Sequence, residues 1–199
     1  MSDFAADARA LLDHLGIDRA VVCGCSMGGY AALAFCAAFP ESLAGLVLAD
    51  SRAGADAPDG RERRLDMARR VMTEGSGFVA ESMIPKLLGR TSHERRPELC
   101  EWLERQIAAA APAGIAAAQR GMAERPDLTA ILPRIAVPVL ILVGGEDELI
   151  PPEESFRMAR EIPGARTVVL PEAGHLASLE RPDAFNQALS EFLRGGSFS

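Results

Sequence analysis

A short apolar run, a serine between glycines and a helix-forming segment follow one another directly near the start of the chain. Ala20 to Cys25 is typical of a short apolar strand, and Gly28 to Phe39 is apolar on nearly every face, typical of a buried helix. Between them, Gly24-Cys25-Ser26-Met27-Gly28 fits the pattern G-x-S-x-G. A serine at such a junction lies on a sharp turn that lifts its hydroxyl away from the sheet. We expect glycine at 24 and 28 because the chain folds back too closely there to leave room for a Cβ. The chain must therefore place an apolar strand directly before a buried helix.

Strands and helices alternate through much of the remaining sequence. Further strands are predicted in the stretches "LAGLVLAD" (43–50), "VPVLILVGGED" (137–147) and "RTVVLPEAGH" (166–175). Helices are predicted from Glu153 to Ile162 and from Pro182 onward. Continuous apolar strands that alternate with helices predict an α/β fold, with a parallel sheet covered by helices on both faces.

The segment before the first strand, residues 2–15, is predicted as an amphipathic helix. Ser2 is placed to cap its start and Gly16 to end it. The side chains expected to face the core are Phe4, Ala8, Leu11, Leu12 and Leu15.

Residues 53–132 contain no convincing strand and consist of helix-period segments bounded by Gly, Pro or Ser. We therefore divide the chain into an α/β core, residues 1–52 and 133–199, and a helical cap or lid, residues 53–132. Five large side chains of this region could line a pocket beneath the lid or form its own core: Met67, Met72, Met83, Met122 and Trp102.

Composition and charge exclude several classes of function. Because the formal net charge is −7, we expect no nucleic-acid-binding surface. The sequence has no apolar run of membrane-spanning length and no signal peptide, so we expect neither a membrane partner nor secretion. The four cysteines lack the spacing of a zinc site or a disulfide framework. We predict a cytoplasmic protein without a metal or cofactor.

A serine hydroxyl needs a general base to act as a nucleophile. The sequence has three histidines. His14 lies in the first helix and His93 in the polar stretch "RTSHERR", whereas His175 follows the last predicted strand. Gly174 is expected to give the backbone freedom just before His175. Sites of open α/β sheets lie at the carboxyl ends of the strands, which favours His175 as the base.

The base in turn needs an acid to orient it. Asp147 follows the third predicted strand after a Gly-Gly turn and gives the order Ser…Asp…His, while Asp50, at the end of the second strand, is the alternative. A merely charged loop, with Glu146 and Glu148, is the other reading of this stretch. The N–H of Met27 is predicted to donate to a developing oxyanion at the helix N-terminus.

The motif, the order of its partners and the loops that carry them resemble the α/β-hydrolase family. The resemblance runs through "GCSMGGYAALAFCAAFPESLAGLVLAD", "VPVLILVGGEDELIPP" and "LPEAGHLASLERPDAFNQAL". Within the family, the pattern is most similar to esterases and lactonases of the 3-oxoadipate enol-lactonase type. The resemblance implies Ser26 as nucleophile, His175 as base and Asp147 as acid. A serine at this turn, where dehalogenases and epoxide hydrolases carry aspartate, argues against those two activities.

The front of the chain departs from the family pattern. Members of the family usually carry several strands before this motif and a His-Gly type loop that supplies a second oxyanion N–H. Here one helix precedes the motif, so the resemblance implies an N-terminally truncated core, whether as a fragment of a longer protein or as a chain covered by another. We expect the strand before Ser26 to lie at an open sheet edge, which is a site for self-association.

Three hypotheses follow for the function. The first is a serine hydrolase that cleaves a small carboxylic ester or lactone through an acyl-enzyme. The second is a C–C bond hydrolase or a cofactor-free perhydrolase of the same fold. The third is a non-catalytic chain that pairs with a partner through its open sheet edge.

Overall fold

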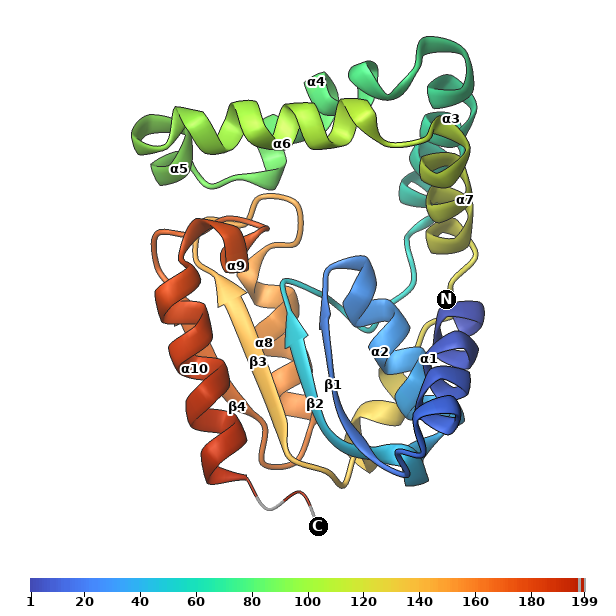
Figure 1. Cartoon of the computed structure of the whole chain (residues 1–199), viewed down its shortest axis with the longest axis vertical. Coiled ribbons are helices and arrows are strands. Elements are labelled where there is room, and N and C mark those ends of the chain that lie inside the picture. The colour runs from blue at the N-terminus through green and yellow to red at the C-terminus, as the bar shows by residue number, and fades with distance from the viewer. Residues whose placement is uncertain (197, 199) are drawn as a thin grey trace.

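The computed structural model of the chain describes residues 1–196 and 198, and shows a parallel sheet with helices on both faces (Figure 1). Within these residues, no helix is both long and apolar enough to cross a membrane. The elements in chain order are α1 (Ser2–Leu15), β1 (Ala20–Cys25), α2 (Met27–Ala38), η1 (Pro40–Ser42), β2 (Leu43–Ala49), α3 (Pro58–Glu74), α4 (Ser76–Leu87), α5 (Arg90–Arg95), α6 (Pro97–Ala109), α7 (Pro112–Ala123), η2 (Thr129–Arg134), β3 (Val139–Gly144), α8 (Pro152–Glu161), β4 (Arg166–Leu170), α9 (Ala177–Glu180) and α10 (Pro182–Gly195).

The four strands lie in the order β1-β2-β3-β4, and every neighbouring pair is parallel. The register places Cys25 opposite Ala49, and Ala49 in turn opposite Leu142. The carboxyl ends of the strands therefore meet at one edge of the sheet. The residues that follow each strand gather at that edge, where α/β sheets carry their sites. The predicted α/β fold class is confirmed.

Alternating side chains of the central strands enter two different cores. Leu46 and Leu48 of β2 pack toward α1, α2 and α8, while Val47 and Ala49 pack toward α10. β2 and β3 are buried along their whole length, as is typical of strands covered on both faces. This burial explains why both strands are continuous apolar runs without the alternation of a half-exposed strand.

The apolar face predicted for α1 is only partly correct. Phe4, Leu11 and Leu15 are 49%, 57% and 57% exposed, and the residues that pack against the core are Ala5, Ala8 and Leu12. Small alanines allow α1 to approach α2 closely, and this places the larger side chains on the outer side. Ser2 does not cap the helix, because α1 already begins at this residue. Gly16 ends the helix with a φ of 66°, as predicted.

Helices α3 to α7 lie beyond the carboxyl end of the sheet and form the upper part of the molecule in Figure 1. α3 packs against α7, and α4 packs against α6. Met67 and Met83 pack into the apolar cluster of these helices, whereas Met72 and Trp102 are 54% and 41% exposed. The boundaries of the lid at residues 53 and 132 remain a prediction.

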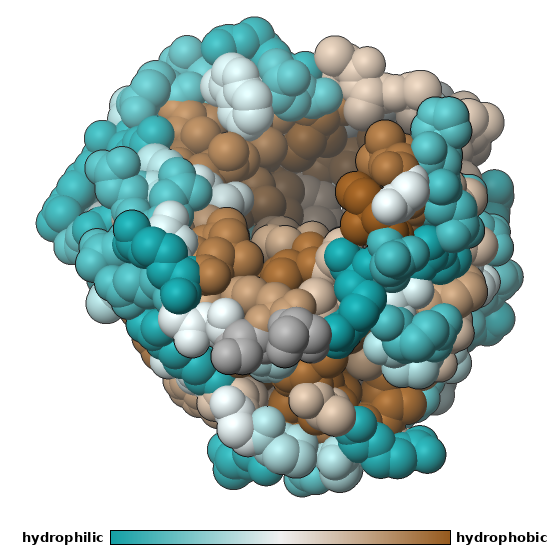
Figure 2. All heavy atoms as spheres, turned by 60° about the horizontal axis from the view of Figure 1, so that its bottom comes forward, coloured by the Kyte–Doolittle hydropathy of each residue, from teal (hydrophilic) through white to brown (hydrophobic). Residues whose placement is uncertain are grey.

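β1 pairs only with β2 in the part of the chain that the structure describes, and so lies at a sheet edge. Cys23, in the middle of β1, is exposed. On the face presented in Figure 2, apolar residues gather around a hollow. The pairing of β1 with β2 alone, among the described strands, confirms the expected edge position of β1.

Candidate active site

Ser26 lies in a strained turn between β1 and α2. Its φ of 53° and ψ of −115° are unusual for a residue with a Cβ, and such a conformation costs on the order of 1–3 kcal/mol. The N–H of Ser26 donates to Ala49 O over 2.9 Å, and its carbonyl oxygen accepts a 2.9 Å hydrogen bond from the Ser51 hydroxyl. These bonds from the end of β2 hold the turn in place.

The glycines around Ser26 differ in what they contribute. A Cβ on Gly24 would lie 2.1 Å from Gly28 O, so no larger residue fits there. A Cβ on Gly28, by contrast, would meet nothing within 4 Å, so the expectation that Gly28 also lacks room is wrong. Gly29 is the second crowded position, because a Cβ there would lie 2.3 Å from Ser51 Oγ. The second position at which only glycine fits is therefore Gly29, one residue after the last glycine of the G-x-S-x-G pattern.

Three side chains predicted from the sequence meet above this turn. His175 Nε2 lies 2.6 Å from Ser26 Oγ, and His175 Nδ1 lies 2.8 Å from Asp147 Oδ2. His175 is 1% exposed and Asp147 is 4% exposed. They come from three separate parts of the chain, after β1, β3 and β4, and are brought together by the common sheet edge.

The hydrogen bonds of Asp147 define the proton arrangement. A carboxylate only accepts hydrogen bonds, so Nδ1 of His175 carries the proton and donates it toward Asp147. Nε2 of a neutral His175 is then an acceptor for the Ser26 hydroxyl. The other oxygen of Asp147 accepts the N–H groups of Leu149 and Ile150 over 2.8 and 2.9 Å. Asp147 is thus held in place by its own loop.

Met27 is the first residue of α2, so its N–H has no acceptor within the helix. Among the described residues, this N–H also donates to no other group. It lies directly after Ser26 at the positive end of the helix dipole. This is the arrangement expected of an oxyanion donor, and the role itself remains a prediction.

A buried carboxylate that sequence reasoning missed holds the loop around His175. Glu180, in α9, is 2% exposed and bonds both this loop and the chain next to α5. Its four donors are Gly174 N at 2.9 Å, Leu176 N at 3.2 Å, Gly89 N at 2.8 Å and Ser92 Oγ at 2.6 Å. The only available signal was an acidic residue inside the apolar stretch "LASLERP". Glu180 therefore ties α5 to the residues on both sides of His175.

Gly174 was expected to give the backbone freedom before His175, but the structure shows a different reason for it. A Cβ on Gly174 would lie 2.2 Å from the backbone nitrogen of Gly89. The two backbones are in direct contact, and only glycine permits this approach.

The two other histidines lie outside this cluster. His14, in α1, and His93, in α5, are exposed. His93 Nδ1 lies 3.5 Å from Cys100 Sγ and contacts neither Ser26 nor Asp147 among the described hydrogen bonds. Of the three histidines, only His175 lies within hydrogen-bond distance of Ser26, as a general base must.

Asp50, the alternative acid, is also buried but has different partners. Its Oδ1 accepts the N–H of Gly144 over 2.6 Å, and its Oδ2 has no hydrogen-bond partner among the described residues. Burial raises the pKa of Asp50 to about 8, with the nearby charges of Asp147 and Glu180 adding to this effect against the opposing backbone hydrogen bonds. His175 forms its hydrogen bond with Asp147.

The raised pKa of Asp50 predicts a pH-dependent loss of stability. The folded state keeps the Asp50 proton up to a pH of about 8, whereas the unfolded chain releases it near 3.8. The free energy of unfolding should therefore fall as the pH rises between these values and level off above them. Asp50→Asn removes this titration, and asparagine tolerates the φ of 46° at this position.

Urea unfolding of both proteins between pH 5 and pH 9 measures the effect. The unfolding free energy of the parent should decline more steeply with pH than that of the variant. Parallel lines for the two proteins would show that Asp50 has no raised pKa.

Comparison with known proteins agrees with this fold. The model of the alpha/beta hydrolase fold family matches residues 1–182. This chain belongs to that family of enzymes.

Individual relatives include esterases, lactonases and C–C bond hydrolases. The solved structure of a thermophilic esterase from Thermogutta terrifontis, with malate bound, is 47% identical, with a TM-score of 0.93 over 96% of this chain and 71% of that chain. 3-Oxoadipate enol-lactonase 2 of Acinetobacter baylyi is 28% identical over 98% of this chain and 71% of its own length. A 2-hydroxy-6-oxononadienedioate/2-hydroxy-6-oxononatrienedioate hydrolase of Pseudomonas putida is 29% identical over 97% of this chain and 69% of its own length. The resemblance inferred from the sequence is confirmed.

Proposed function

We propose that the protein is a serine hydrolase that cleaves a small-molecule carboxylic ester or lactone. Ser26 is the nucleophile, His175 the general base and Asp147 the acid that orients it. The observation that carries this proposal is the continuous pair of hydrogen bonds from Ser26 through His175 to Asp147, 2.6 and 2.8 Å long. Nucleophile, base and orienting acid in this order are what acyl transfer requires.

The geometry supports the following sequence of steps. Ser26 Oγ attacks the substrate carbonyl carbon while its proton passes to His175 Nε2, and Asp147 stabilises the imidazolium that forms. The negative charge on the former carbonyl oxygen develops near Met27 N–H and the N-terminus of α2. The intermediate then expels the alkoxide, which takes the proton from His175, and leaves an acyl group on Ser26. A water molecule activated by His175 hydrolyses this ester and restores the enzyme.

A second candidate is cleavage of a C–C bond next to a ketone. It is favoured by the Pseudomonas putida relative, whose name describes such a hydrolase and which matches nearly the whole chain. The same three side chains serve both reactions, so their geometry does not favour one over the other. The 47% identity to an esterase supports ester cleavage as the first candidate.

In this proposal the protein's partner is the small ester or lactone, and the reaction uses no metal or cofactor.

The edge position of β1 supports a second proposal, that copies of the chain associate through this strand. A cytoplasmic location remains a prediction from the cysteine pattern.

Turnover of 4-nitrophenyl butyrate, together with labelling by an alkyl fluorophosphonate, tests the proposed function. We expect ester hydrolysis, and a stable phosphonyl adduct on the peptide that carries Ser26, because an activated serine attacks phosphorus as it attacks a carbonyl. A lactone and a vinylogous 1,5-diketone assayed in parallel compare the two candidates. Absence of turnover and of the Ser26 adduct would refute the proposal, and faster cleavage of the diketone would favour the second candidate.

A further inference from the structure

A group of three arginines around one aspartate lies between the lid helices and the end of β2. Asp56, with a side chain 4% exposed, forms ion pairs with Arg52, Arg64 and Arg125. The Arg125 side chain is 3% exposed and donates to both carboxylate oxygens over 2.7 and 2.9 Å. Burial opposes the charge of Asp56, but the hydrogen bonds from Arg125 and Arg64 outweigh it and hold its pKa well below the usual range. Asp56 is therefore ionised, and the group retains two positive charges in excess.

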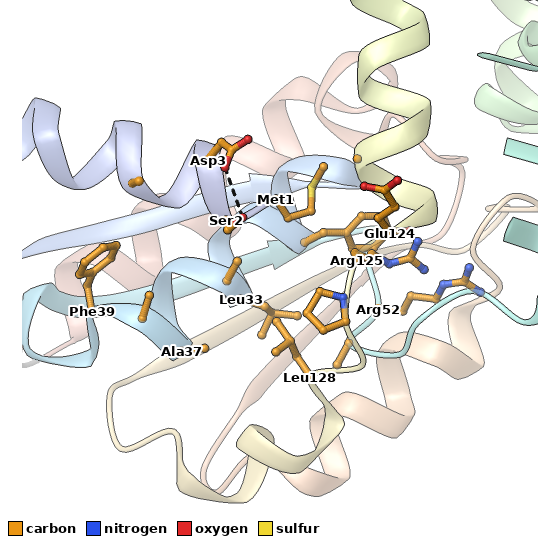
Figure 3. Close-up of a pocket in the computed structure, with 17 residues that line it drawn as sticks. Met1, Ser2, Asp3, Leu33, Ala37, Phe39, Arg52, Glu124, Arg125 and Leu128 are labelled. Atoms are coloured by element: carbon orange, nitrogen blue, oxygen red, sulfur yellow. Dashed lines mark hydrogen bonds between the residues drawn. The ribbon is translucent and has the colours of Figure 1, made fainter. Parts of the chain in front are cut away.

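Two cavities adjoin this group. Figure 3 shows the first, of about 630 Å³, lying between α1, α2 and the chain that follows α7, with Arg52 and Arg125 at one end. Its remaining wall is mostly apolar, and none of Ser26, Asp147 and His175 is among its described lining residues. The second cavity, of about 370 Å³, lies between α3, α4, α7 and the loops after β2 and β3. Arg52 lines both of them.

The second cavity, which we call the lid cavity, is strongly basic. Its basic lining residues are Arg52, Arg63, Arg64 and Lys86. Asp56 is the one acidic residue among the described lining residues. Arg63 is paired with Asp59, but Lys86 forms no ion pair within the described residues. Lys86 is the only lysine of a sequence whose formal net charge is −7. A concentration of positive charge in an acidic protein indicates an anionic ligand.

The two loops that border the lid cavity, after β2 and after β3, also form hydrogen bonds with the candidate active site. Arg52 directly follows Ser51, whose Oγ donates to Ser26 O over 2.9 Å. One residue spans about 3.8 Å, so the Arg52 backbone lies within about 10 Å of the Ser26 carbonyl oxygen. Leu149, which also lines the cavity, donates its N–H to Asp147 over 2.8 Å. The walls of the lid cavity thus belong in part to the two loops that hold Ser26 and Asp147, while none of Ser26, Asp147 and His175 is among its described lining residues.

We propose that the lid cavity binds a carboxylate carried by the substrate, so that the enzyme prefers half-esters or lactones with a free carboxylate to neutral esters. The excess charge of Arg52 and Arg64 holds the carboxylate on the inner wall, and Lys86 contacts it from the exposed rim. Met67, Met83 and Leu149 supply apolar contact for the carbon chain between the carboxylate and the reacting carbonyl. This inference rests on the proposed function, since it assigns a substrate class to the same site.

The kinetic test compares two esters that differ only at the end of the acyl chain. Mono-4-nitrophenyl glutarate ends in a carboxylate, whereas 4-nitrophenyl pentanoate ends in a methyl group at the same position. With the buffer rate subtracted, kcat/KM should be about 10- to 100-fold higher for the glutarate ester, mainly through KM. Lys86→Gln and Arg64→Gln should each lower this ratio several-fold. Arg105→Gln, which removes an exposed cation from another lid helix, should leave the ratio unchanged.

A labelling experiment tests the site without turnover. The amines of the chain are Lys86 and the N-terminus, so the reaction of each with trinitrobenzenesulfonate can be followed by mass spectrometry of the peptides. Glutarate should slow the labelling of Lys86 several-fold relative to neutral glutaramide, while the N-terminal amine serves as the internal reference. Thermal unfolding of Arg64→Gln shows whether that variant remains folded, and Lys86→Gln, at the exposed rim, carries the test if it does not.

The outcomes separate this inference from the proposed function. If neither ester is hydrolysed, the proposed function fails, and the labelling result still decides whether the cavity binds a carboxylate. If Ser26 hydrolyses both esters with equal kcat/KM, or if the ratio is unchanged in Lys86→Gln and Arg64→Gln, the substrate preference is overturned while the proposed function stands. Equal labelling of Lys86 with glutarate and glutaramide overturns the carboxylate site itself.

Discussion

Ser26→Ala is expected to lower kcat for ester hydrolysis by about 10⁴- to 10⁶-fold, because the variant retains no group that can form the acyl-enzyme. The Ser26 hydroxyl lies 2.6 Å from His175 Nε2, and removing it eliminates the first step of the reaction. Alanine retains the Cβ that already occupies this strained turn, so the fold should be preserved. Steady-state kinetics with 4-nitrophenyl butyrate measure the loss, and circular dichroism and thermal unfolding verify the fold.

Ser190→Ala is the matched control for this variant. Ser190 is exposed on α10, and its replacement should leave kcat and the unfolding temperature unchanged. A Ser26→Ala protein that hydrolyses the ester at nearly the parental rate would rule out Ser26 as the nucleophile.

Asp147→Asn should produce the second-largest effect, a fall in kcat of about 10⁴-fold. An asparagine amide can donate to His175 Nδ1, and this favours the tautomer in which Nε2 carries the proton. In that tautomer, Nε2 has no lone pair to accept the proton of Ser26. A pH–rate profile accompanies the measurement. Recovery of part of the rate at high pH would show that another group can orient His175.

Asp50→Asn provides the comparison for this prediction. Asp50 is also buried at the end of a strand, but its Oδ1 accepts the N–H of Gly144. We expect its replacement to lower kcat far less than Asp147→Asn. A larger loss in Asp50→Asn than in Asp147→Asn would identify Asp50 as the acid and contradict the proposed role of Asp147.

Much of this protein follows from sequence patterns whose physical basis is local. β2 and β3 are continuous apolar runs because they are buried on both faces, and each was predicted from that property. The G-x-S-x-G pattern predicted the sharp turn at Ser26. Its first glycine, Gly24, is required because the backbone of Gly28 packs directly against it. The order of Ser26, Asp147 and His175 along the chain, each after a strand, predicted their meeting, since parallel strands end at a common edge.

Other features depend on contacts between distant segments, which no local pattern encodes. The outward side of α1 was misjudged because the approach of α2 selects Ala5 and Ala8 over the larger Phe4 and Leu11. The crowded glycine after Ser26 is Gly29, because Ser51, at the end of another strand, packs against it.

The same limit applies to the polar groups around the site. Glu180 resembles any acidic residue in the sequence, and its function as a link between α5 and the His175 loop requires four donors from two separate segments. The excess charge of the lid cavity likewise arises only when Arg52, Arg64 and Arg125 converge on Asp56. The sequence by itself determined the fold class and predicted which three side chains meet at the sheet edge, since these depend on local apolar patterns and on strand order. Only the tertiary structure decided which buried charges surround them, because a charge is compensated or left in excess by neighbours that are remote in the chain.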